Sequence, residues 1–71
     1  MNLELINKMN DLLIGQANKD GVELSEIFNS NEDLNNFLIS KAIKYAMNHG
    51  KSLEEAYDFV LGDGAYKGIA S

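Results

Sequence analysis

HGKSLEEA, residues 49–56, contains the tripeptide Gly50-Lys51-Ser52, which also closes the phosphate-binding loop of many nucleotide-binding enzymes. That loop has the pattern G-x-x-x-x-G-K-[ST] between a strand and a helix, so its first glycine would stand at position 45, where this chain has Tyr45. The residues before Gly50 have the apolar period of a helix and not of a strand. The stretch is therefore interpreted as the corner between two helices, which favours an all-α fold.

Two capping signals mark this corner. Gly50 suits the left-handed backbone conformation in which many helices end. Ser52 and Glu55 have the S-x-x-E spacing of a capping box, in which each side chain accepts a hydrogen bond from an otherwise free backbone N–H. The helix after the corner is predicted to end at Gly62, and its apolar stripe consists of Leu53, Ala56, Tyr57, Val60 and Leu61.

Upstream of the corner, residues 32–48 are predicted to form the central helix. Ser30 is the expected N-cap, and Asp33 stands three residues later, close to a capping box. The apolar positions form one broad stripe that Ile39 and Ile43 widen: Leu34, Phe37, Leu38, Ala42, Tyr45 and Ala46. Because so much of its circumference is apolar, we expect neighbours on two sides of this helix. The first predicted core residues are Phe37, Leu38 and Tyr45.

Two further elements precede the central helix. Residues 2–17 carry apolar side chains at steps of three and four, which predicts an amphipathic helix ending at NKDG, residues 18–21. The segment VELSEIF, residues 22–28, fits either an extended stretch or a helix of one or two turns that begins near Leu24 or Ser25. We favour the short helix, because no partner strand is visible elsewhere in the sequence.

The sequence thus predicts a single helical domain over residues 1–71, a small compact all-α bundle of three main helices plus one short helix. Residues 62–71 are a candidate glycine-rich C-terminal tail, whose Tyr66 and Ile69 either close the core of the same chain or leave Tyr66 as an interface anchor. A chain of 71 residues buries only about 60% of its unfolded surface, and without Cys it has no disulfide. We expect tight helix packing, or burial against a second copy or a partner.

The composition argues against several classes of function. Net charge is −5 and every basic residue except His49 is Lys, so we do not expect direct binding to nucleic acid or to an anionic membrane. No apolar run approaches the ~20 residues of a membrane span, and we expect a cytoplasmic protein. With no Cys and one His, a Cys-rich or His-rich metal site is excluded, and no cofactor is predicted.

Neither metal binding nor catalysis is predicted from the remaining polar residues. QANKDGVELSEI, residues 16–27, has part of the spacing of a calcium loop, but Ile27 stands where that loop needs its bidentate acid. His49 is the only histidine and lies near Ser52. The Ser52 hydroxyl is better explained as a helix cap, and no third group is placed to orient the pair.

Three functions remain, and we favour a non-catalytic interaction or regulatory module that binds another protein or a second copy of itself. The alternative is an acidic inhibitor of the kind found among small phage proteins, whose carboxylates imitate nucleic acid in the basic groove of an enzyme. A weaker alternative is a helix-turn-helix DNA-binding regulator, against which the acids of the second helix count, because a recognition helix lies beside phosphates. The candidate partner-binding residues are Glu54, Glu55, Asp58, Asp63 and Tyr66.

Overall fold

The computed structural model describes residues 1–70, and these form five helices with no strand among them. The helices are α1 (Leu3–Asp20), α2 (Leu24–Ile27), α3 (Asn31–Asn48), α4 (Leu53–Leu61) and α5 (Ala65–Ala70). This confirms the all-α fold, with α1, α3 and α4 as its main helices and α2 as the predicted short one. Helix α5 was not predicted: the sequence-based expectation for residues 62–71 is a glycine-rich tail, and the structure has a short helix there.

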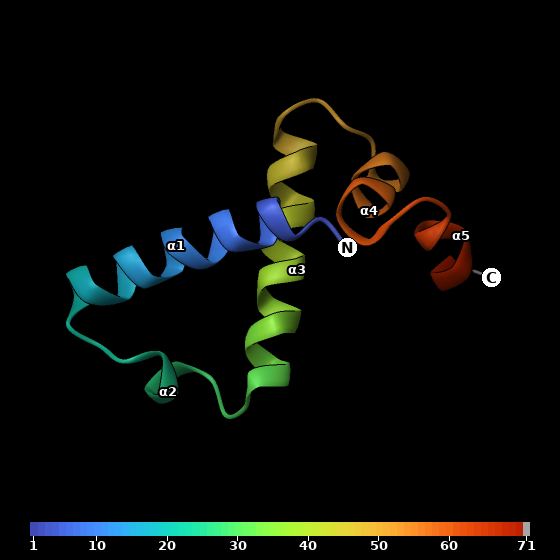
Figure 1. The fold of residues 1–71 in the computed structure, drawn as a ribbon. Coiled ribbons are helices and arrows are strands. Elements are labelled where there is room, and N and C mark those ends of the chain that lie inside the picture. The colour runs from blue at the N-terminus through green and yellow to red at the C-terminus, as the bar shows by residue number, and fades with distance from the viewer. Residues whose placement is uncertain (71) are drawn as a thin grey trace.

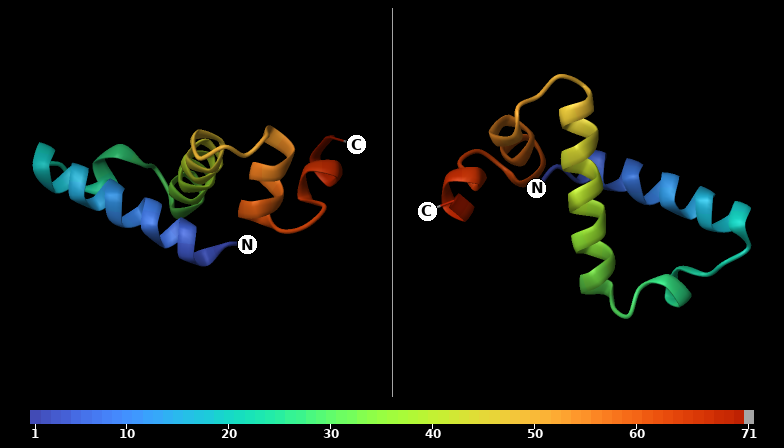
Figure 2. Two further views of the ribbon diagram at one scale, coloured as in Figure 1. Left: turned by 90° about the horizontal axis from the view of Figure 1, so that it is seen from above. Right: turned by 180° about the vertical axis from the view of Figure 1, so that it is seen from behind.

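Helix α3 is the central element of the bundle. Helix α1 crosses one side of α3, α4 packs against the other, and α5 packs against α4 (Figure 1). Helix α2 lies at the far end of the molecule from α4 and α5, beside the diverging ends of α1 and α3 (Figure 2). The prediction that the central helix has neighbours on two sides is therefore confirmed.

The core lies where α1, α3 and α4 meet. Ala42 and Ala56 are completely buried and Ala46 is almost so, and such small side chains let helices approach closely. The Asn2 N–H donates a hydrogen bond of 2.7 Å to the Val60 carbonyl, which ties the start of α1 to the end of α4. The buried cluster comprises Leu5, Ile6, Met9, Leu38, Ala42, Ile43, Ala46, Ala56 and Val60.

The corner between α3 and α4 forms as predicted. Gly50 has a φ of +98°, and the Lys51 N–H donates to the Ala46 carbonyl at 3.2 Å, which closes the end of α3. Ser52 and Glu55 then form a complete capping box: the Glu55 N–H donates to Ser52 Oγ at 3.2 Å, and the Ser52 N–H donates to the Glu55 carboxylate at 3.0 Å. The Gly-Lys-Ser tripeptide is thus a helix corner.

The other helix ends also follow local signals, with one difference. Ser30 Oγ caps α3 by accepting from the Asp33 N–H at 3.2 Å, as expected. Helix α1 continues to Asp20, past the predicted end at Ala17, because the residue that ends it is Gly21, with a φ of +73°. The three polar residues before Gly21, at positions 18–20, form the last turn of α1 and are not part of the loop that follows.

The capping box predicts a contribution to stability that is lost at acidic pH. The backbone hydrogen bond from Ser52 lowers the pKa of the Glu55 carboxyl below its ordinary value. A lowered folded-state pKa adds stability that is present above the unfolded-state pKa and is lost as the pH falls through the folded-state pKa. Glu55→Gln is therefore expected to flatten the acid limb of stability against pH in that window, measured by urea unfolding at a series of pH values. Glu54→Gln is the matched control on the same turn, and equal flattening by the control contradicts the prediction.

Two of the three predicted core residues are only half-buried. Leu38 is 4% exposed, as predicted, but Phe37 and Tyr45 lie at the edge of the core. The reason is that α1 crosses α3 at a steep angle, so only part of the length and circumference of α3 lies against α1 (Figure 1). Phe37 packs instead against Phe28, with ring centroids 5.1 Å apart.

The C-terminal half of α1 and helix α2 project from the bundle as an arm (Figure 2). The radius of gyration is 13.2 Å, against about 11 Å for a compact domain of this length. The molecule measures 39 × 24 × 16 Å along its principal axes. The arm is consequently thin, and its apolar side chains have few neighbours of the same chain to cover them.

Candidate functional site

The acidic residues predicted to bind a partner lie on and after α4, and two of them have structural partners. The Glu55 carboxylate accepts from the Ser52 N–H in the capping box. Asp58 Oδ1 accepts from the Tyr66 N–H at 3.1 Å, which ties the first turn of α5 to α4. Glu54 and Asp63 are exposed. The candidate acidic site is thus partly used to hold the helices of this chain in place.

Tyr66 also packs within its own chain. The Tyr66 ring meets the Tyr57 ring edge to face, with centroids 5.6 Å apart, and the Tyr66 side chain is half-buried. Ile69, the other apolar residue of the last segment, is 62% exposed. Closing the core of the same chain was one of two open alternatives for Tyr66 and Ile69. Tyr66 packs against its own chain, and Asp58 and Tyr66 meet as parts of the α4–α5 contact.

His49 and Ser52 take part in separate interactions. The His49 ring stacks on the Tyr45 ring with centroids 4.1 Å apart, and its Nδ1 lies 2.9 Å from the Tyr45 carbonyl oxygen. Ser52 Oγ accepts the capping hydrogen bond from the Glu55 N–H. This geometry stabilises the end of α3 and the start of α4.

The part of the chain that resembles a calcium loop in spacing does not form a loop around an ion. Residues 16–20 belong to α1, and Gln16 Nε2 donates to both carboxylate oxygens of Asp20, at 3.0 and 3.1 Å. Within residues 1–70, no three His, Asp or Glu side chains lie close enough together to hold a metal ion. In the same residues, no helix combines the length and the apolar character needed to cross a membrane.

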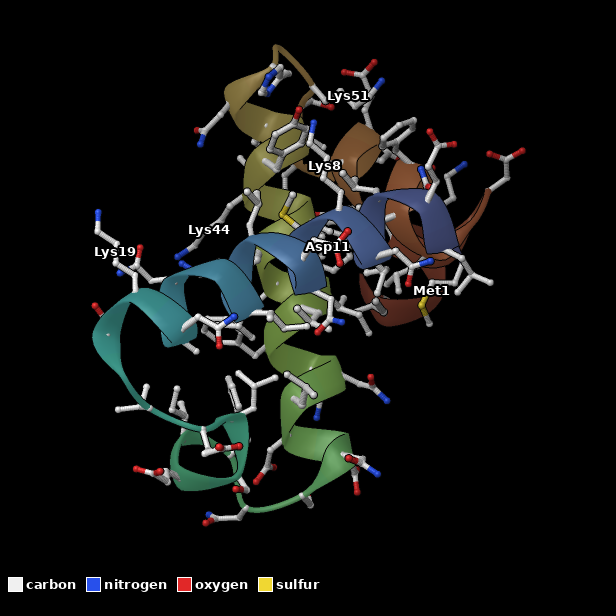
Figure 3. All side chains as sticks on the ribbon, turned by 60° about the vertical axis from the view of Figure 1, so that its left-hand side comes forward. Met1, Lys8, Asp11, Lys19, Lys44 and Lys51 are labelled. Atoms are coloured by element: carbon white, nitrogen blue, oxygen red, sulfur yellow. The ribbon has the colours of Figure 1, made fainter. Side chains whose placement is uncertain are left out.

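Lysine side chains lie over aromatic rings on one side of the bundle. Lys8 Nζ donates to the Tyr45 hydroxyl at 2.8 Å and lies 4.7 Å from the centroid of that ring. Lys51 Nζ lies 4.5 Å from the centroid of the Phe59 ring, which is 47% exposed. Lys8 lies towards the start of α1, in the same part of the molecule as Lys51 (Figure 3). Their aliphatic stems therefore cover apolar surface while the amines stay at its edge.

An apolar hollow between α1 and α3 is the feature that the sequence analysis missed. The hollow has a volume of about 290 Å³ and is lined by Met9, Leu12, Leu13, Gln16, Phe37 and Lys41. Leu12 is 59% exposed at its rim, and Lys41 Nζ lies 5.3 Å from the Phe37 ring centroid. The available signal was the width of the apolar stripe on α1, which includes Leu12 as well as Met9 and Leu13.

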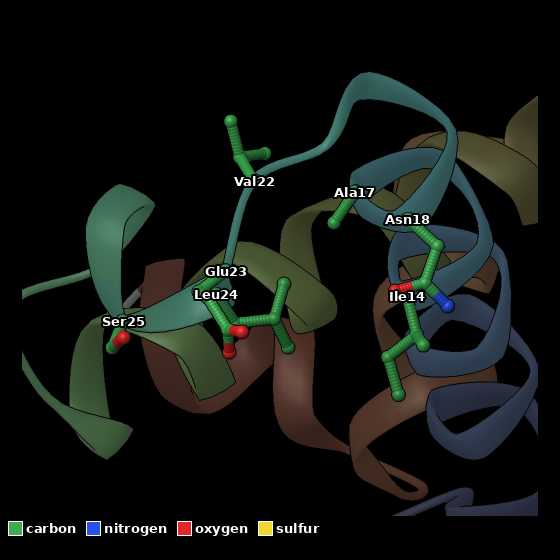
Figure 4. A pocket seen from close by; sticks show the side chains of 7 residues that line it. All are labelled: Ile14, Ala17, Asn18, Val22, Glu23, Leu24 and Ser25. Carbon is green, nitrogen blue, oxygen red and sulfur yellow. The ribbon is translucent and has the colours of Figure 1, made fainter.

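A second hollow lies at the junction of α1 and α2 (Figure 4). Its volume is about 350 Å³, and both of the helices and the turn between them contribute to it. The lining residues are Ile14, Ala17, Asn18, Val22, Glu23, Leu24 and Ser25. The arm therefore has a hollow between its two helices as well as one beside α3, which fits the small number of residues that cover it.

Comparisons with protein-family models, with curated proteins and with solved structures found no match for this chain. The class defined by the fold is a small all-α domain, and an exposed apolar hollow lies between its helices α1 and α3. Its function is inferred below from the physical properties of that surface.

Proposed function

We propose that this chain is a non-catalytic protein-interaction module and that its contact surface is the α1–α3 face, defined by Met9, Leu12, Leu13, Gln16, Phe37 and Lys41. The observation that carries the proposal is the apolar hollow beside the exposed Leu12 side chain. The chain has 5026 Å² of accessible surface, about 600 Å² more than the ~4,400 Å² of a compact monomer of its mass. Apolar surface left in water is the main source of free energy for association between proteins.

An exposed apolar side chain and an apolar hollow lie next to each other on this face. Leu12 is more exposed than most apolar residues of the chain and borders a hollow whose floor is apolar. Rigid helices supply this face, and they hold the protruding side chain and the hollow in fixed relation. A partner that covers the face removes Leu12 and Phe37 from water without having to rearrange the bundle.

The acidic inhibitor stays the alternative proposal. Its candidate residues lie at the α4–α5 end, away from the α1–α3 face, and Glu55 and Asp58 already accept hydrogen bonds from this chain. The helix-turn-helix DNA-binding regulator is the weaker alternative. Its recognition helix would be α4, which carries no Lys to contact phosphates. Dependence on salt separates the proposals, because contacts between charges are screened by salt and an apolar contact is not.

Site-specific photocrosslinking tests the proposed function. A photoreactive phenylalanine replaces Leu12, 59% exposed, or in a control chain Ile69, which is 62% exposed on α5. Each chain is irradiated in a lysate of the source organism at low and at high salt. We expect a discrete protein adduct from position 12 at both salt concentrations and none from position 69. Equal adducts from both positions, or no adduct from position 12, would overturn the proposal, and adducts confined to low salt would favour the acidic inhibitor.

A further inference from the structure

We propose that the partner on the α1–α3 face is an acidic segment of another protein, which places an apolar side chain in the hollow and carboxylates beside the lysines around it. This inference rests on the proposed function, because it names the chemistry of the occupant of the same surface. Two properties of the face carry it: the apolar lining of the hollow, and a gathering of positive charge on a chain whose net charge is −5.

Four of the six lysines of the chain lie around the hollow, and all four are exposed. Lys41 lines the hollow, and Lys44 follows about one helical turn later on α3. Lys8 and Lys19 lie before and after Leu12 on α1. Figure 3 shows that Lys8, Lys19 and Lys44 extend to the same side of α1, although they come from two helices.

The carboxylates of α1 and α3 lie away from these lysines. Lys8 and Lys19 are within about 40° of Leu12 around the axis of α1, because successive residues are about 100° apart. The acids of this helix are about 80–100° from Leu12 on the same measure, and they are Glu4, Asp11 and Asp20. The acids of α3 belong to its first turn, about two turns before Lys41. No acid is among the residues that line the hollow.

The lysines keep hydrogen-bonding capacity for a partner. The side chains of Lys19 and Lys44 have no ion-pair or hydrogen-bond partner within residues 1–70. Lys8 Nζ donates one hydrogen bond to the Tyr45 hydroxyl at 2.8 Å, and an ammonium group has three N–H donors. Carboxylates that meet these amines therefore replace water and no bond of this chain is broken.

An apolar residue flanked by acids satisfies both properties of the face. The hollow of about 290 Å³ gains from burying an aliphatic or aromatic side chain, because its lining includes Met9, Leu13 and Phe37. The apolar side chain supplies affinity that persists at high salt, and the lysines determine which segment is admitted. A second copy of the same face would instead set lysines against lysines. A long nucleic acid is disfavoured by the net charge of −5 and by the absence of Arg.

Peptide selection tests the chemistry of the partner. A displayed library of random peptides is panned against the immobilised full chain, and the enriched peptides are synthesised. We expect them to be acidic, to contain a large apolar residue, and to crosslink to the photoreactive residue at position 12 but not at position 69. Neutral or basic peptides that crosslink at position 12 overturn the inference and leave the proposed function standing. If no peptide is enriched, the inference fails, and crosslinking of position 12 in lysate decides the proposed function separately.

Charge reversal tests the role of the lysines. Lys19→Glu/Lys44→Glu is expected to raise the dissociation constant of an enriched acidic peptide about tenfold in fluorescence anisotropy, because two attractions become repulsions. The same peptide with its acids replaced by lysine is expected to prefer this double variant to wild type. Lys67→Glu on α5 is the control and is expected to leave binding unchanged. Circular dichroism checks that each variant keeps its helix content.

Two outcomes of these measurements contradict the acidic partner. One is equal affinity of the acidic peptide for wild type and the double variant, which means that the lysines do not contact it. The other is a single-stranded DNA that binds wild type more tightly than the enriched peptides and loses binding in the double variant, which assigns the lysines to nucleic acid.

Discussion

Replacing Leu38 by Ala is expected to destabilise the chain by about 2–5 kcal/mol, the range for truncating a buried leucine. Leu38 is 4% exposed in the cluster where α1, α3 and α4 meet, so the lost side chain leaves a cavity between three helices. A domain of this length has about 4–10 kcal/mol of stability in all. The single substitution therefore removes a large share of the stability, and the variant is expected to be partly unfolded at room temperature.

Urea unfolding followed by circular dichroism measures this loss. Leu3→Ala is the matched control, because Leu3 is 64% exposed on α1 and the same atoms are removed. We expect the control to stay within about 0.5 kcal/mol of wild type. Phe37→Ala is expected to cost less than Leu38→Ala, since Phe37 is only half-buried. A Phe37 variant less stable than the Leu38 variant would contradict the placement of these residues, and would restore the sequence-based assignment of Phe37 to the core.

Enlarging Ala42 to Leu is expected to cost about 1–3 kcal/mol through overpacking. Ala42 is completely buried on α3 within the cluster formed with α1 and α4, and a larger side chain forces the helices apart. For a domain of this size, each kcal/mol lowers the melting temperature by about 4–8 °C. Thermal unfolding by circular dichroism measures the shift.

Ser40→Leu is the control for this second prediction. Ser40 lies two residues away on α3 and is exposed, so the added side chain meets water and no neighbouring helix. We expect its melting temperature to stay close to that of wild type. If Ala42→Leu is as stable as Ser40→Leu, the helices do not pack closely around Ala42, and the described packing of the bundle is incorrect.

The local structure of this chain was largely predictable from the sequence. Ser30, Ser52 with Glu55, and Gly50 act within a few residues of themselves, through hydrogen bonds and a backbone conformation that need no distant partner. These short-range signals explain why the central helix, the corner and the start of α4 form where they were predicted. The roles of the candidate partner-binding residues could not be predicted in this way. The hydrogen bond from the Tyr66 N–H to Asp58, for example, depends on how α5 packs against α4.

The amino-acid sequence by itself determined that the segments of α1, α3 and α4 are helical, where α3 and α4 begin, and which side of each of these helices is apolar. Only the tertiary structure decided which neighbour covers each apolar side. Helical period places Phe37 and Leu38 on one stripe, but the angle at which α1 crosses α3 buries Leu38 and leaves Phe37 at the edge. The same crossing leaves Leu12 beside an uncovered hollow. A crossing angle depends on the packing of side chains far apart in the chain, and no local pattern specifies it.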